Sequence, residues 1–246
     1  MVLLRPLGFG EMLDETLDLY RRNWLLLISI AAAAYLPFTL GAWAVGEPRQ
    51  PNASHLDFWL YTFALMAVLE LETAALVLAA SNRYLGRRAS LAGVYRHALR
   101  RWPLLLVLKT VTYIGIGLGS LLIVPGIALG FWCTFLTPVF MLEGTSMSQA
   151  WERARFLSAK EWGRIFGFYL LVTALVATFS LQPQAWTQLI KDQEMSWRVM
   201  QIWSTISTPL LHPVWALANM VLYYDIRIRK EAFDLQLQAE ALAAVS

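Results

Sequence analysis

The chain has 246 residues, of which 58% are hydrophobic and 15% charged, with a mean hydropathy of +0.50 and a formal net charge of +3 at pH 7. Soluble domains carry roughly 25% charged residues, so the composition excludes an ordinary water-soluble protein and indicates one whose main solvent is lipid. Cys133 is the single cysteine, which excludes an intramolecular disulfide and a metal site built on several thiolates.

The first predicted elements are an amphipathic helix and two membrane spans. The segment GFGEMLDETLDLYRRNW ends at Trp24, and one of its helical faces consists of Gly8, Phe9, Met12, Leu13 and Thr16. About 20 apolar residues are needed to cross a hydrocarbon core ~30 Å thick. Two such runs follow, from Trp24 to Val45 and from Phe58 to Ala80.

A second amphipathic helix is predicted over SLAGVYRHALRRW, which begins at Ser90. Its polar face is basic, and its apolar face consists of Leu91, Val94, Tyr95, Ala98 and Trp102. Ser90 is a favourable N-cap because its hydroxyl can accept a hydrogen bond from a free amide of the first turn. Two spans follow, Leu104 to Val124 and Ile127 to Leu142, and the Val-Pro-Gly sequence between them predicts the turn of a helical hairpin.

The pattern recurs in SMSQAWERARFLSAKEW, which begins at Ser146 and ends at Trp162, and Ser146 is again a favourable N-cap. Its apolar face consists of Met147, Ala150, Trp151, Ala154 and Leu157. The last two predicted spans are Ile165 to Leu181 and Val199 to Tyr223. Beyond them we expect a cytoplasmic tail helix, because apolar residues recur at spacings of four and three at Ile228, Ala232, Leu235, Ala239 and Leu242.

These elements predict an all-α fold, a polytopic membrane helical bundle. Six transmembrane helices are arranged as three pseudo-repeated hairpins, each preceded by an amphipathic cytoplasmic helix. Residues 1–246 form one membrane domain, with repeats at 8–80, 90–142 and 146–223 and a tail helix at 224–246.

The distribution of basic residues predicts the orientation of the bundle. The segment between the second and third spans contains no acid and six arginines, Arg83, Arg87, Arg88, Arg96, Arg100 and Arg101. The segment between the fourth and fifth spans contains Arg153, Arg155, Lys160 and Arg164. Since Lys and Arg beside spans are retained in the cytoplasm, both segments are expected there. An even number of spans then places both termini in the cytoplasm as well.

Three blocks of the sequence resemble one family: RPLGFGEMLDETLDLYRRNW, YLGRRASLAGVYRHALRRW and YYDIRIRKEAFDLQLQAEAL. They are similar to bacterial multi-pass proteins described as glycerophosphoryl diester phosphodiesterase membrane-domain proteins, or as uncharacterised membrane proteins. The resemblance implies a helical bundle in the bacterial cytoplasmic (inner) membrane. It does not imply phosphodiesterase activity, because the segments between spans reach only about 25 residues, whereas a catalytic barrel takes ~250.

Four ionisable residues fall inside predicted spans, where charges are costly and often functional. They are Glu70 and Glu72 in the second span, Lys109 in the third and His212 in the sixth. Depth along the helices favours Glu72 with Lys109 and Glu70 with His212. The pairs are either structural ion pairs or parts of a proton or ion relay.

The sixth span carries a polar face beside Pro209 and Pro213. The face consists of Gln201, Thr205, Thr208, His212 and Asn219. It either lines a cavity or forms interhelical hydrogen bonds. Close helix packing is predicted at three pairs of glycines with small-xxx-small spacing, namely Gly115 with Gly119, Gly126 with Gly130, and Gly163 with Gly167.

The basic faces of the amphipathic helices are candidate contacts for anionic lipid headgroups. The residues concerned are Arg96, Arg100, Arg101 and Arg153. Alternatively, these helices are connectors that pack under the bundle and obey the positive-inside rule. Orientation also accounts for the basic charge, so no nucleic-acid partner is expected.

Catalytic motifs are absent from the sequence, and we expect neither an enzyme nor a metal or cofactor. The leading hypothesis is a non-enzymatic accessory or scaffold protein, with membrane lipids as partners and a protein partner at the tail helix. The alternative is a small transporter or lipid-handling protein that uses Glu70, Glu72, Lys109 and His212. An intramembrane enzyme is the third hypothesis.

Overall fold

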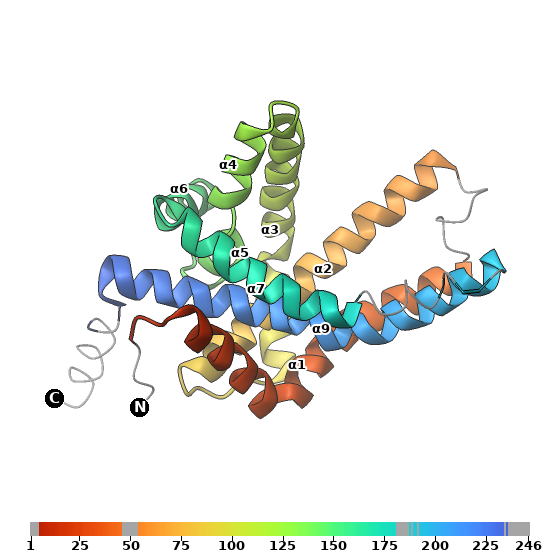
Figure 1. Cartoon of the computed structure of the whole chain (residues 1–246), viewed down its shortest axis with the longest axis horizontal. Helices are drawn as coiled ribbons and strands as arrows, with labels where there is room; N and C mark the ends of the chain where they lie inside the picture. The colour runs from red at the N-terminus through yellow and green to blue at the C-terminus, as the bar shows by residue number, and fades with distance from the viewer. Residues whose placement is uncertain are drawn as a thin grey trace.

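The computed structural model describes residues 5–45, 54–180, 187, 189–190, 192–233 and 235. Within these residues the fold is helical and contains no strand (Figure 1). The helices are α1 Phe9–Val45, α2 His55–Tyr84, α3 Leu91–Ser120, α4 Val124–Trp132, α5 Leu136–Leu142, α6 Met147–Ser158, α7 Trp162–Ser180 and α9 Gln193–Glu231. The predicted all-α class is therefore confirmed.

Helix α1 is kinked between its amphipathic and its apolar parts. Asn23 has non-helical backbone angles, φ −128° and ψ 17°, and its side-chain amide donates a hydrogen bond to the Leu19 carbonyl at 3.0 Å. Trp24 follows the kink directly. The predicted amphipathic helix and the first predicted span are thus joined without a loop, and the kink allows them to run in different directions.

The predicted N-caps of the other two amphipathic helices are confirmed. Ser90 Oγ accepts a hydrogen bond from the Gly93 amide at 3.2 Å, and α3 begins at the next residue. Ser146 forms a capping box with Gln149, in which each side chain accepts from the backbone amide of the other. Helix α3 continues into the third predicted span, whereas α6 ends before α7 begins. The repetition of three such units remains a prediction.

The hairpin between α3 and α4 differs from its prediction. The turn lies at Leu121–Ile123, where Ile123 has φ of +57°, and Pro125 stands in the first turn of α4. Proline is favourable there because the amide that it lacks would have no intrahelical partner. The prediction of a turn at Val-Pro-Gly is therefore wrong, since this proline begins a helix.

The backbones at the two ends of the hairpin turn lie in close contact at Gly119 and Gly126. A Cβ atom at Gly126 would lie 2.6 Å from the Ser120 amide nitrogen and 2.7 Å from Ser120 Cα. Because backbone atoms cannot move aside, we expect Gly126→Ala to lower the free energy of unfolding by roughly 1–3 kcal/mol, the usual cost of overpacking. Thermal unfolding in detergent micelles measures this change.

Gly130→Ala is the matched control for that substitution. A Cβ atom there would meet nothing within 4 Å, so the variant should be neutral or slightly stabilised by the higher helix propensity of alanine. Equal destabilisation of the two variants would contradict the close approach. Of the other predicted glycines, Gly167 packs against the Phe9 ring, whereas Gly115 and Gly163 have open space beside them.

Five stretches of the described chain are long and apolar enough to cross a membrane. They are α1, α2, α3, α7 and the stretch Val124–Leu142, which contains α4 and α5 and is interrupted at Cys133–Phe135. Helix α9 is not among them, because the polar residues and two prolines of its central part lower its mean hydropathy. The sixth span therefore remains a prediction.

Helix α9 runs without a break from Gln193 to Glu231 and ends where Ala232 adopts a left-handed conformation with φ of 49°. The helix passes residue 224, the predicted start of the tail helix, without interruption, and the tail helix over residues 224–246 remains a prediction. Of the predicted tail stripe, Ala239 and Leu242 lie outside the described residues.

Helices α1 and α9 lie side by side and antiparallel. The Leu7 amide, just before α1, donates to Asp225 at 2.8 Å, and the Tyr20 hydroxyl donates to the Leu210 carbonyl at 2.9 Å. Residue numbers thus rise along one helix as they fall along the other. Figure 1 shows α2 diverging from this pair and the turn end of the α3–α4 hairpin extending away from both.

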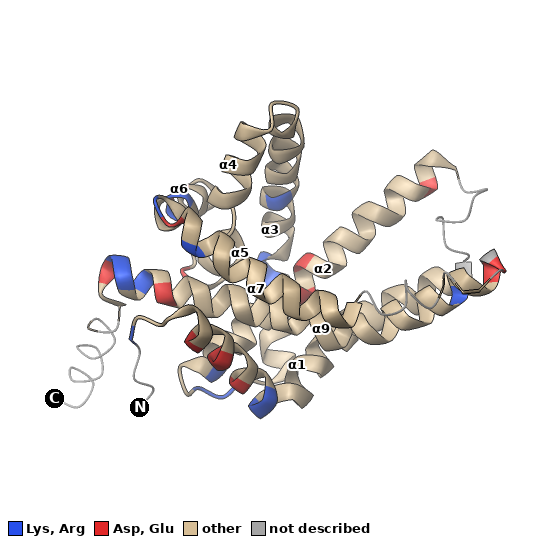
Figure 2. Ribbon diagram, viewed as in Figure 1, with Lys and Arg blue, Asp and Glu red and all other residues tan. Residues whose placement is uncertain are grey.

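The core lies where α1, α2, α5 and α9 converge. Short side chains on α2 allow close packing there, and the largest fully buried side chains include Met12, Leu27, Leu76, Phe135, Phe140 and Tyr223. Away from this point many large apolar side chains are exposed, as expected of a surface that faces lipid. Figure 2 shows that α4 carries no charge and α7 only one, at its beginning.

Candidate functional site

The four ionisable residues predicted within the membrane form two pairs, each between two helices. Lys109 Nζ of α3 lies 3.5 Å from Glu70 Oε1 of α2, which also accepts a hydrogen bond from the Tyr113 hydroxyl at 2.6 Å. His212 Nδ1 of α9 lies 2.7 Å from Glu72 Oε1. The pairing of Glu72 with Lys109 and of Glu70 with His212, which depth favoured, is therefore wrong.

Helical geometry explains the exchange of partners. Residues two positions apart differ by about 200° around a helix axis, so Glu70 and Glu72 point to different neighbours of α2. Glu70 faces α3 and Glu72 faces α9. Both residues are buried, and Oε2 of each has no hydrogen-bond partner among the described residues.

The predicted polar face of α9 lines a cavity along part of its length. The cavity has a volume of about 310 Å³ and lies between α1, α2 and α9; the face contributes Gln201, Thr205 and Thr208 to its lining. His212 and Asn219 do not line it. His212 is paired with Glu72, and Asn219 donates a hydrogen bond to the Thr134 carbonyl at 3.3 Å. One part of this face therefore lines a cavity, and the other part forms contacts with neighbouring helices.

The four arginines predicted to contact lipid headgroups divide into two groups. Arg96 and Arg100 are exposed on α3, and headgroup contact remains a prediction for them. Arg101 donates to the Thr145 carbonyl and lies over a phenylalanine ring, and Arg153 forms ion pairs within the protein. The guanidinium groups of Arg101 and Arg153 thus bind other segments of the chain.

Arg153 is the centre of an ion-pair network between the end of α5, α6 and α9. Its Nε lies 2.9 Å from Glu143 Oε2, and its terminal nitrogens contact both carboxylate oxygens of Glu231. Arg227 Nε lies 3.1 Å from Glu231 Oε2. Burial opposes the charge of Glu231, but hydrogen bonds from the two arginines outweigh it and hold its pKa below the ordinary value of 4.5. Its contribution to stability is therefore present above pH 4.5 and is lost as the pH falls through the lower folded pKa.

Asp225 joins three further segments and was not among the predicted site residues. Its side chain is 0% exposed, and its carboxylate lies 2.6 Å from Arg164 Nε of α7 and 3.0 Å from Arg229 Nε of α9. It also accepts from the Leu7 amide, while both arginines donate to the Leu7 carbonyl. The sequence does carry a signal, because Asp225 is an acid four positions before Arg229 on a helix.

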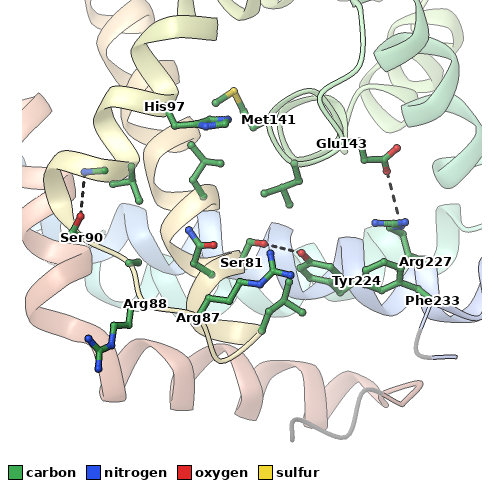
Figure 3. Close-up of a pocket in the computed structure, with 17 residues that line it drawn as sticks. Ser81, Arg87, Arg88, Ser90, His97, Met141, Glu143, Tyr224, Arg227 and Phe233 are labelled. Atoms are coloured by element: carbon green, nitrogen blue, oxygen red, sulfur yellow. Dashed lines mark hydrogen bonds and ion pairs between the residues drawn. The ribbon is translucent and has the colours of Figure 1, made fainter. Parts of the chain in front are cut away.

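A second cavity, of about 730 Å³, adjoins these networks (Figure 3). It is lined by the end of α2, the loop to α3, the first turns of α3, the end of α5 and the end of α9, and it is open on one side. Arg87 extends toward its centre, whereas Arg88 points away from it. Ser81 and Tyr224 share a hydrogen bond of 2.7 Å in its wall. Among the described residues, no carboxylate lies within 4.0 Å of either arginine side chain.

The chain was compared with known protein families, curated proteins and solved structures. No family model, curated protein or solved structure matches the chain. In the part of the chain that the structure describes, no three His, Cys, Asp or Glu side chains lie close enough together to hold a metal ion.

Proposed function

We propose that this chain is a multi-pass membrane protein without catalytic activity, which acts as an accessory or scaffold protein. The mutual pairing of its intramembrane ionisable groups carries the proposal. Oε1 of Glu70 is paired with Lys109 and Tyr113, and Oε1 of Glu72 is paired with His212. Each pair links α2 to another helix, so these groups act as connections within the bundle.

Six crossings with both ends in the cytoplasm of a bacterium fit this proposal. The hydrogen bond between Leu7 and Asp225 brings the start of α1 and the end of α9 to the same end of the molecule. If α9 is the sixth span, an even number of crossings has this result. The concentration of arginine at that end supports a cytoplasmic position, and the family resemblance supports the inner membrane.

The proposed partners are lipids around the exposed apolar faces and a protein bound beyond the end of α9. Val111 of α3 and Leu170 of α7 are large exposed apolar side chains with no charged residue beside them, which suits contact with acyl chains. Leu235 follows the end of α9 and is 60% exposed. An apolar residue at the aqueous end of the bundle suits contact with a protein.

Site-specific photo-crosslinking in native membranes tests the scaffold role. A photoreactive residue in place of Leu235 should give discrete protein adducts that mass spectrometry identifies. The same residue in place of Leu170, which is similarly exposed on α7, is the control and should give lipid adducts. Absence of a protein adduct at both positions would contradict the proposal.

A second candidate function, a small transporter or lipid-handling protein, is favoured by the cavity beside α9. Thr208 lines this cavity and lies one helical turn before His212. In proteoliposomes with an imposed pH difference, this function predicts ion or lipid movement that falls in His212→Gln and Glu72→Gln. Movement no faster than in protein-free vesicles would exclude it and leave the scaffold role standing.

A further inference from the structure

We propose that the cavity of about 730 Å³ is a binding site for a phosphate-bearing anion at the membrane surface. Some charged residues of the lining form ion pairs within the protein, and those that do not are positively charged, which favours an anion. Arg227 is paired with Glu231, and Glu143 is paired with Arg153. Arg87 and Arg88 remain as the lining residues whose charge is not compensated by a described carboxylate. This site does not depend on the scaffold role.

The polar groups around Arg87 suit a phosphate group. A guanidinium group donates two parallel hydrogen bonds to phosphate oxygens, which a single ammonium cannot do. Ser81 and Tyr224 have two hydroxyl groups but share only one hydrogen bond, so one O–H remains to donate to a ligand. Figure 3 shows the Arg87 side chain extending toward these two hydroxyls.

The remaining walls indicate that the phosphate carries an apolar group. They consist of Leu78, Leu85, Val94, Met141, Leu142 and Phe233. A free inorganic anion gains nothing from such walls, whereas a phospholipid places its glycerol and first acyl carbons against them. The shared chemistry is a phosphate ester, and the headgroup of an anionic phospholipid is the source that the walls favour.

Position distinguishes this site from a generally basic surface. Arg87 and Arg96 are both exposed side chains. Arg96 lies on α3, one residue from His97 of the cavity lining, but only Arg87 belongs to the lining. A general attraction between basic residues and anionic lipid would treat Arg96 and Arg87 alike. Binding in a built site should depend on Arg87 and not on Arg96.

Native mass spectrometry of the detergent-solubilised protein, titrated with phosphatidylglycerol or phosphatidylcholine, tests the proposal. We expect phosphatidylglycerol to bind more tightly than phosphatidylcholine. Arg87→Gln should raise the apparent Kd for phosphatidylglycerol at least about tenfold, the effect of losing even one of the two charge-assisted hydrogen bonds. Arg96→Gln should change it less than about twofold, because Arg96 lies outside the cavity lining. Arg87→Lys, which retains the charge, should fall between wild type and Arg87→Gln if the paired donors matter.

Inorganic phosphate, added as a competitor, distinguishes the two sources. If phosphatidylglycerol binding depends on Arg87 and phosphate does not displace it, the ligand is a lipid headgroup. If phosphate itself binds in an Arg87-dependent way and phosphatidylglycerol does not, the ligand is a soluble phosphate ester. Equal effects of Arg87→Gln and Arg96→Gln in variants with unchanged thermal unfolding, or no binding of either probe to the wild type, would overturn the proposal.

Discussion

Asp225→Asn is expected to lower the free energy of unfolding by about 3–5 kcal/mol, the usual result of removing one partner from a buried ion pair. The carboxylate is fully buried and contacts Arg164, Arg229 and the Leu7 amide. The amide that replaces it is uncharged, so Arg164 keeps a largely buried charge without its counterion. Thermal or SDS-induced unfolding of the purified protein in mixed micelles measures the loss.

Asp18→Asn is the matched control, since Asp18 also pairs with an arginine four positions away, Arg22. That pair is exposed, with Asp18 at 51%, so the change should cost less than about 1 kcal/mol. A loss at Asp225 as small as the loss at Asp18 would mean that water reaches the carboxylate. The connection between the N-terminal segment, α7 and α9 would then depend on apolar packing alone.

The features that the sequence predicts correctly depend on neighbouring residues. The caps at Ser90 and Ser146 are set by residues within one helical turn, and the long apolar runs that predict spans need only their own length and composition. These features do not change with the way in which the helices are packed. They could therefore be found without knowledge of any contact.

The features that the sequence misses depend on which neighbour each helix face meets. The depth of a residue along a span does not give the direction in which its side chain points around the helix axis. Pairing by depth therefore assigns the partner of Glu72 to Glu70 and the partner of Glu70 to Glu72. The sequence presents Arg87 only as an orientation signal, because the cavity that it lines also needs residues of α5 and α9, which are far away in the sequence. Asp225 was missed for the same reason, since Arg164 lies 61 positions before it.

Lys109→Met is expected to destabilise the protein by about 3–5 kcal/mol, because it leaves the carboxylate of Glu70 buried without its cation. Glu70→Gln in the same chain should recover much of this loss, since the neutral amide needs no counterion and can still accept from the Tyr113 hydroxyl. Unfolding of the two single variants and the double variant gives a coupling energy, which we expect to lie between roughly 0.5 and 3 kcal/mol.

A second double-mutant cycle, with Glu72 in place of Glu70, distinguishes the observed pairing of Lys109 with Glu70 from a pairing of Lys109 with Glu72. Glu72 lies on α2 only two positions from Glu70 but faces His212 of α9. Combining Lys109→Met with Glu72→Gln should therefore give additive losses, with a coupling energy within about 0.5 kcal/mol of zero. If Glu72→Gln rescued Lys109→Met and Glu70→Gln did not, α2 would be rotated relative to its neighbours and the pairing by depth would be correct. Coupling confined to Glu70 would instead establish that α2 uses opposite faces to hold α3 and α9, which is the arrangement a structural role for these charges requires.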